Sequence, residues 1–239
     1  MIHLRAIWKR ELQAYFFTPV GYVFMGVFLL LSAAMFYVTV MLNRSSDLPT
    51  FIGMMSYLWM LLCPVLTMRL LAEERQKRTD QLLLTSPASL PGVVLGKYLA
   101  AITVMLMTVL LTLLFVLVVA IYGAVYPEEL FVSYLGFILQ GCAFIALDLF
   151  LSGLAGNQVT AAVMAFGANL LLWMLDLLET AVSIGFMREA LSFLSLYARS
   201  EAFLMGQLSF AGVGYFLSFA AAFILLTIHV LDSRRYRGT

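Results

Sequence analysis

The densest group of chemically active side chains in this sequence is a charged stretch between two long apolar runs. The segment MRLLAEERQKRTDQLLLTSP holds seven charged residues among the twelve from Arg69 to Asp80. Glu73 and Lys77 are four residues apart with the acid first, as are Glu74 and Arg78, and this order stabilises a helix. The orientation of a protein in the membrane depends on lysine and arginine beside its helices, so orientation can explain the basic residues of this stretch. It does not explain the acidic ones.

An apolar patch and a turn follow these charges. Three leucines come next, and Ser86 with Pro87 predicts a cap and a break before a further short helix. This combination fits a groove on a partner protein, because apolar side chains supply contact area and charges set the register. The residues predicted to make the contact are Glu73, Glu74, Arg75, Lys77, Arg78, Asp80, Leu82, Leu83 and Leu84. The alternative is a solvated face beside the membrane.

Catalytic and metal chemistry find little support in the sequence. The segment GVVLGKY resembles a phosphate-binding loop, but three residues rather than four separate its glycines, and tyrosine stands where a hydroxyl must reach magnesium. Asp148 and Asp176 could form the acid–base pair of an intramembrane protease, but they are predicted to lie at different depths. Both cysteines fall in apolar runs and are predicted to be packing residues. We therefore predict a non-catalytic chain with no cofactor or metal of its own.

Composition places these residues in a membrane protein. Of 239 residues, 63% are hydrophobic and 11% are charged, and the mean hydropathy is +1.00; a soluble domain is usually about 45–50% apolar and about 25% charged. The net charge of +1 gives no field that would attract nucleic acid. We predict an all-α polytopic fold, a single transmembrane domain over residues 1–239, with spanning helices over residues 20–42, 51–71, 98–122, 132–154, 159–177 and 213–231. Pro64 lies inside the second span and should kink it.

The pattern of the first 18 residues predicts a helix that lies in the interface between the lipid bilayer and water. Its apolar residues share one face, and the basic residues, with Lys9 and Arg10 beside Trp8, fall mostly on the other. Glu11 breaks the pattern because it lands on the apolar face.

The distribution of positive charge predicts the orientation. If both termini are cytoplasmic, eleven lysines and arginines lie on the cytoplasmic side and three lie outside. A multi-pass protein of the inner, cytoplasmic membrane follows, with loop 72–97 inside and segment 178–212 outside. The outer segment is half-apolar and predicts short interfacial helices, where an accessory envelope protein could dock.

Three polar side chains are predicted inside the spans. Asp148 is costly at that depth if charged, so it should face protein or a water path. It could contact substrate or a dimer interface, or it could be a protonated or paired packing residue. Gln140 and Asn169 are candidates for hydrogen bonds between helices. Because Asp148 stands nearly alone and no internal repeat is visible, an ion-coupled secondary carrier is the weaker alternative.

The stretch MRLLAEERQKRTDQLLLTSPASLPGVVLGKYLA resembles the cytoplasmic loop of ABC-2 type permeases, the membrane subunits of ATP-binding cassette exporters. The opening KRELQAYFFTPVGYV resembles especially the gliding-motility-type branch, and the tail GYFLSFAAAFILLTIHVLDSRRYR is similar to the same family. A departure is the run from Lys77 to Thr79, where many relatives have a glycine. The residues that match the loop pattern are Arg69, Glu73, Glu74, Arg75, Leu82, Leu83, Ser86, Pro87, Gly96 and Lys97.

This resemblance implies a six-helix permease with an N-terminal interfacial helix. Residues 72–86 would form or flank the coupling helix, which sits in a groove on an ATP-binding subunit and transmits its closure. The working unit would contain two ATP-binding subunits, which hold ATP and magnesium, and two permease chains, identical or homologous. The implied function is ATP-driven export. The alternatives are an ion-coupled carrier and a mechanotransmitting subunit of an envelope complex that moves no substrate.

Overall fold

The apolar runs of the sequence fold into long helices. The computed structural model describes residues 2–78, 89–181 and 195–237, and those residues form helices and connecting turns without a strand. Within this described part, six helical stretches are long and apolar enough to cross a membrane: Pro19–Leu42, Leu48–Gln76, Leu90–Tyr122, Pro127–Leu154, Gln158–Leu178 and Phe210–Ser233. The predicted all-α fold with six spanning helices is therefore confirmed, and the chain is a multi-pass membrane protein.

Prolines set several of the helix starts. The second to sixth spans are α3 (Leu48–Thr67, continued by α4), α6 (Leu90–Tyr122), α7 (Pro127–Leu154), α8 (Gln158–Ala181) and α11 (Phe210–Arg237). The first span is α2 (Pro19–Phe36), whose last turn, η1 (Tyr37–Leu42), is π-helical. Helices α6 and α7 begin earlier than predicted, at Leu90 and Pro127, because each has proline in its first two positions, where proline is favoured. In α7 this first turn carries Glu128 and Glu129, so hydropathy alone missed it.

The second span is divided near its proline. Helix α3 continues through Pro64 to Thr67, and α4 (Arg69–Gln76) begins after a turn at Met68. Proline has no N–H to donate, so Pro64 leaves the carbonyl of Met60 without its intrahelical partner. The interruption predicted at Pro64 thus appears one turn later, between α3 and the charged helix α4.

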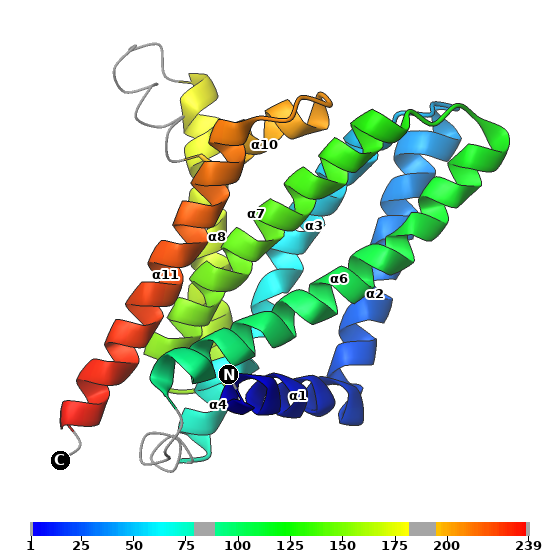
Figure 1. Ribbon diagram of the computed structural model, residues 1–239. Helices are drawn as coiled ribbons and strands as arrows, with labels where there is room; N and C mark the ends of the chain where they lie inside the picture. The colour runs from blue at the N-terminus through cyan, green and yellow to red at the C-terminus, as the bar shows by residue number, and fades with distance from the viewer. Residues whose placement is uncertain (1, 79–88, 182–194, 238–239) are drawn as a thin grey trace.

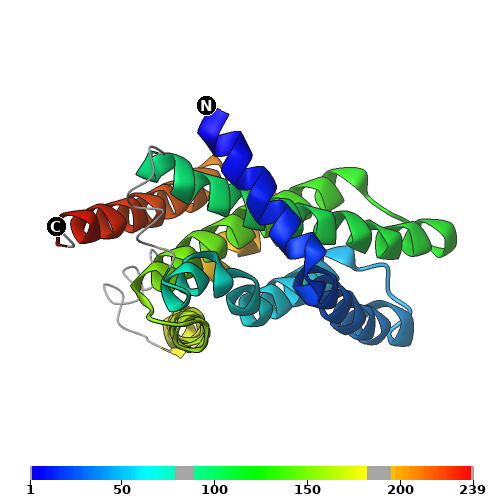
Figure 2. The same cartoon turned by 90° about the horizontal axis from the view of Figure 1, so that it is seen from below.

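One end of the bundle, here called the base, carries α1 (Ile2–Phe17) and α4. Figure 1 shows α1 lying across this end of the bundle, and Figure 2 shows it passing beneath the long helices. Both ends of the chain lie at the base (Figure 1). Helix α10 (Leu196–Leu204) packs against α7 at the opposite end. The first residues thus form a helix as predicted, and its place in the membrane interface stays a prediction.

Helices α3 and α7 form the centre of the bundle. In their spanning stretches 67% and 61% of residues are buried, against 17% in α8 and 22% in α11. Trp59 of α3 is enclosed by edge-on rings of Phe24, Phe28 and Phe137, whose centroids lie 5.7, 5.7 and 6.1 Å from its own. Such aromatic pairs add specific geometry to the packing. The outward faces of α8 and α11 therefore remain free for lipid or a second protein.

The crossing of α1 over α6 depends on a glycine. A Cβ atom at Gly96 would lie 2.8 Å from Cγ2 of Ile7 and 3.4 Å from the carbonyl oxygen of Leu4. We expect Gly96→Val to push α1 away from α6 and to lower stability by about 1–3 kcal/mol, the usual cost of overpacking. Thermal unfolding in detergent measures this change. Gly214→Val, in α11 where nothing lies within 4 Å, is the matched control, and equal effects of the two would contradict the close contact.

Candidate functional site

The first turn of helix α4 is capped by a side chain from another helix. The hydroxyl oxygen of Ser152, near the end of α7, accepts hydrogen bonds from the backbone N–H groups of Leu71 at 3.2 Å and Ala72 at 3.1 Å. The same hydroxyl lies 3.2 Å from the carbonyl oxygen of Met68, to which it can donate. A capping side chain ordinarily comes from the helix itself. Ser152 therefore fastens the start of α4 to α7.

Two arginines hold α4 from other directions. Arg75 donates from Nη1 to the carbonyl oxygens of Leu154 and Ala155, both at 2.9 Å, where α7 ends and its carbonyls lack intrahelical partners. Arg69 donates to the hydroxyl of Thr18 at 3.1 Å, and its guanidinium lies 5.1 Å from the ring centre of Tyr15 on α1. Both contacts tie α4 to neighbouring elements of the same chain.

Four charged side chains from three helices meet at the base, and we call them the ion cluster: Arg10, Glu11, Glu74 and Lys97. Lys97 Nζ lies 3.0 Å from Oε1 of Glu11 and 3.0 Å from Oε1 of Glu74. Arg10 Nη2 lies 2.9 and 3.0 Å from the same two oxygens. The Lys97 side chain is 1% exposed, so its charge depends on these carboxylates. Two cations and two anions make the cluster neutral, and it joins α1, α4 and α6.

Electrostatics favour the ionised forms of Glu11 and Arg10. Burial alone raises the pKa of Glu11, but the charge of Lys97 and the hydrogen bonds from Arg10 and Lys97 outweigh it, so that the pKa lies below its ordinary value. The pKa of Arg10 is raised because its hydrogen bond to Glu11 and the charges of both carboxylates exceed the opposing effect of burial.

The ion cluster corrects two expectations. A lysine near a membrane surface ordinarily extends its amine to water, but Lys97 is buried between two carboxylates. Glu74 was predicted to pair with Arg78, and it pairs instead with Arg10 and Lys97. The predicted pair of Glu73 with Lys77 is confirmed at 2.6 Å. Sequence reasoning missed Glu11 as a partner, although its place on the apolar face of α1 was the available signal.

The residues predicted to contact a partner protein divide into two groups. Glu73, Glu74 and Arg75 are bound within the chain, whereas Lys77 and Arg78 are exposed. Together with their exposed neighbour Gln76, Lys77 and Arg78 form what we call the tip of α4. Arg78 has a φ of 54°, a left-handed conformation that ends the helix. Asp80 and the three leucines Leu82, Leu83 and Leu84 lie outside the described residues. The tip is thus the part of the predicted contact that the structure describes as accessible.

A second polar group, the Asp148 cluster, lies inside the bundle and consists of Cys63, Thr67, Asp148 and Asn169. Asn169 Nδ2 donates to the carbonyl of Met60 at 3.2 Å, which is the carbonyl that Pro64 leaves free, and lies 3.4 Å from Asp148 Oδ2. Thr67 Oγ1 also lies 3.4 Å from Oδ2. The prediction that Asn169 bonds between helices is confirmed. Gln140 is buried, but its amide has no hydrogen-bond partner among the described residues.

The rival acid–base pair does not assemble. Asp176 accepts a hydrogen bond from Ser195 at 2.8 Å, beside α10, whereas Asp148 meets Thr67 and Asn169 near the end of α3. Within the described ranges, no group of three histidine, cysteine or acidic side chains could hold a metal ion.

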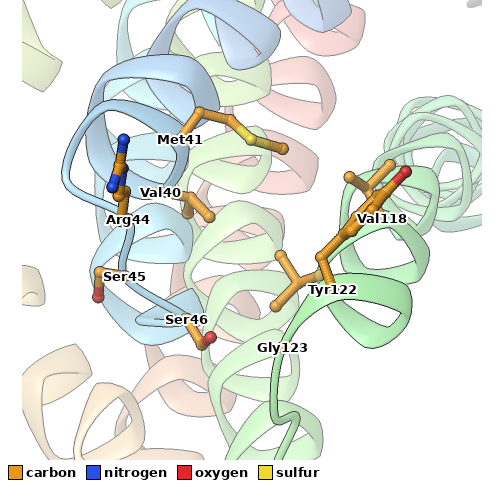
Figure 3. A pocket seen from close by; sticks show the side chains of 9 residues that line it. Val40, Met41, Arg44, Ser45, Ser46, Val118, Tyr122 and Gly123 are labelled. Atoms are coloured by element: carbon orange, nitrogen blue, oxygen red, sulfur yellow. The ribbon is translucent and has the colours of Figure 1, made fainter.

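An open hollow of about 230 Å³ lies far from these clusters, between the end of the first span and the end of α6. Figure 3 shows Arg44, Ser45 and Ser46 on one side and Val118 and Tyr122 on the other. Valines form its floor and hydroxyls and a guanidinium its rim, a mixture that could contact an amphiphile. Because Arg44, Ser46 and Tyr122 are exposed, the rim lacks the buried polar groups of a specific site.

Removing the buried amine tests the ion cluster. We expect Lys97→Met to lower stability by about 3–5 kcal/mol, because it leaves two carboxylates facing each other without their buried cation. Adding Glu11→Gln and Glu74→Gln should restore much of the loss. Unfolding in detergent measures each variant, with Lys77→Met at the exposed tip as control. A Lys97→Met protein as stable as the control would show that the cluster contributes little.

The lowered pKa of Glu11 predicts acid sensitivity. The folded state prefers the ionised form, so this stabilisation is complete above the unfolded pKa of about 4.3 and is lost as pH falls through the folded value. We expect Glu11→Gln to flatten the fall of the unfolding midpoint between about pH 6 and about pH 3. Glu201→Gln, at an exposed acid of α10, should leave the profile unchanged. Identical acid profiles for wild type and Glu11→Gln would exclude this linkage.

A family comparison agrees with this architecture. The model of a family described as ABC-2 family transporter protein matches residues 32–231, which include the second half of the first span from residue 32 on and the whole of α3, α4, α6, α7 and α8. No curated protein matches the chain. The match covers well over half of the sequence, and the six spanning helices fit a permease subunit of an ABC transporter. The chain belongs to the ABC-2 family of transporter proteins.

Proposed function

We propose that this chain is the permease subunit of an ABC exporter and that a separate ATP-binding subunit drives it through α4. The observation that carries the proposal is the position of α4: its body is fixed to three other helices, while its tip is exposed at the base. An element with one free end and a fixed body can receive a displacement and transmit it. The predicted coupling segment, residues 72–86, begins within this helix.

The contacts of α4 supply the route of transmission. Glu74 reaches Lys97 at the start of α6, and Ser152 and Arg75 join α4 to the end of α7. Helix α3 leads directly into α4 through Met68. Displacement of α4 would therefore act on α3, α6 and α7 together. Charged hydrogen bonds are short and strong enough to move such elements as one unit.

The base is proposed to face the cytoplasm. Eight of the lysines and arginines with described side chains belong to α1, α4 with its tip, and the start of α6, whereas Arg44 and Arg199 lie toward the opposite end. Short cytoplasmic loops carry this excess of positive charge. The tip of α4 would then meet ATP-binding subunits, two for each pair of permease chains. The exposed faces of α8 and α11 leave room for the second permease chain, identical or homologous.

ATP and magnesium are proposed to bind only to the partner subunit. Lys97, the lysine of the segment that resembles a phosphate-binding loop, has its amine between Glu11 and Glu74. Two carboxylates at 3.0 Å would repel a phosphate. The likeness of the first residues to the gliding-motility-type branch favours a role in the cell envelope, with segment 178–212 as the place for an accessory protein.

The structure changes which residues should be tested. Reversing the charge of Glu73 and Glu74 would break contacts within the chain as well as any contact with a partner. We expect Lys77→Glu with Arg78→Glu, at the tip, to reduce co-purification of the ATP-binding subunit at least about tenfold, because a charge pair at an interface sets register and affinity. The measurement is a pull-down of the tagged chain from its native membrane, with transport-linked ATPase activity.

The matched control reverses two exposed charges on the other helix of the base. Arg5→Glu with Lys9→Glu changes the net charge equally and should keep more of the partner bound than the tip variant does. Unfolding midpoints of both variants must stay near wild type, so that loss of binding is not loss of folding. Full recovery of the ATP-binding subunit with the tip variant would refute α4 as the docking element.

A further inference from the structure

A carboxyl group lies in the centre of the bundle without a cation beside it. Asp148 of α7 is fully buried, and its neighbours on α3 and α8 are the neutral groups of Thr67 and Asn169 and the thiol of Cys63. A carboxylate at membrane depth costs several kcal/mol unless it is paired or solvated. The ion cluster at the base shows how this chain neutralises buried charge elsewhere, and no such partner reaches Asp148 from the described residues.

The hydrogen-bond inventory fits an uncharged acid. The hydrogen bonds to Asp148 from Thr67 and Asn169 are long, at 3.4 Å, and both fall on Oδ2, while the thiol of Cys63 is a weak third donor beside the carboxyl group. Oδ1 of Asp148 and Oδ1 of Asn169 are buried and have no partner among the described residues. An ionised carboxylate only accepts hydrogen bonds, so two unpartnered acceptors would remain. A protonated carboxyl turns one of its oxygens into a donor, so that Oδ1 of Asp148 is no longer an acceptor that must find a donor of its own.

Titratable groups on the surrounding elements do not alter this conclusion. Helices α3, α4, α6, α8, α10 and α11 all pack against α7. Among their described side chains, the thiol of Cys63 is the titratable group that interacts with Asp148. Tyr98 of α6 and Cys142 of α7 interact with Cys63 and with each other. None of these three groups carries positive charge, and the cations of α4 and α6 are bound at the base.

We propose that Asp148 is an intramembrane proton-binding site, occupied when α3, α7 and α8 are packed together as they are in this structure. Binding converts the carboxylate and one proton into the neutral acid, and no other reactant is needed. The groups that face Oδ2 are an amide N–H and a hydroxyl, which suit a carboxyl group better than a metal ion.

The place of the site links its proton to the movement of α3. Thr67 is the last residue of α3, two positions before α4 begins, and Asn169 is fastened to the carbonyl that Pro64 leaves free. A displacement of α4 would draw Thr67 away from Asp148 and open the cluster to water. Water stabilises the ionised form, so the proton would leave. This link to α4 rests on the proposed function, whereas the proton site itself does not.

Infrared spectroscopy of the purified chain in lipid nanodiscs tests the site without any partner subunit. A protonated carboxyl gives a carbonyl band distinct from that of a carboxylate. We expect wild type at neutral pH to show this band and Asp148→Asn, which keeps the size of the side chain, to lose it. Asp232→Asn, at a half-buried acid near the end of α11, should retain it. A band that persists in Asp148→Asn, or is absent from wild type, would overturn the proposal.

Two further arms separate the alternatives. Sodium chloride should leave the wild-type band unchanged relative to choline chloride at the same pH; its disappearance with sodium would assign the site to a metal cation instead. In the assembled transporter, a non-hydrolysable ATP analogue should weaken the band. A band that is present in the chain alone but insensitive to the analogue would overturn the link to α4 and leave the proton site standing.

Discussion

The buried amine of Lys97 is the constraint on which the base depends. A lysine that is 1% exposed at the start of a membrane helix keeps its charge only if carboxylates surround it. One carboxylate comes from α1 and the other from α4, 63 residues further along the chain. The amine therefore fixes the crossing of α1, and Gly96, its neighbour in sequence, allows α1 to come close enough. The same contacts therefore fix the position of α1 and neutralise the charge of Lys97.

The opposite side of α4 is fixed by backbone chemistry instead of charge pairing. Ser152 serves N–H groups at the start of α4, and Arg75 serves carbonyls at the end of α7. Helix termini leave such groups unsatisfied, and near a membrane water cannot always reach them. The start of α4 and the end of α7 therefore satisfy each other's free backbone groups with hydrogen bonds. This reciprocity gives α7 its central place, because α7 contacts α3, α4, α6, α8, α10 and α11.

Features that depend on a single stretch of the chain could be predicted from the sequence. Features that depend on a contact between two distant stretches could not. Hydropathy predicted six spans and the charged helix, because length and polarity are local properties. The misplaced acid Glu11 pointed to a buried partner without naming it. Lys97 and Ser152 gave no signal, since a lysine near a membrane surface ordinarily extends to water and a serine near a helix end is common. Their roles arise only when α1, α4, α6 and α7 meet.

The two polar clusters differ because their surroundings differ. At the base, two basic and two acidic side chains pair with one another. One or two turns into the bundle, around Thr67, the chain places amides, hydroxyls and a thiol, and it brings no cation among the described residues. A charged group repelled by low dielectric must find a counter-ion or a proton. Helix α3 joins both clusters, since its end at Thr67 touches Asp148 and its continuation, α4, supplies Glu74. A shift of this one element would therefore change the environment of both, and the proton site proposed at Asp148 would respond by releasing its proton.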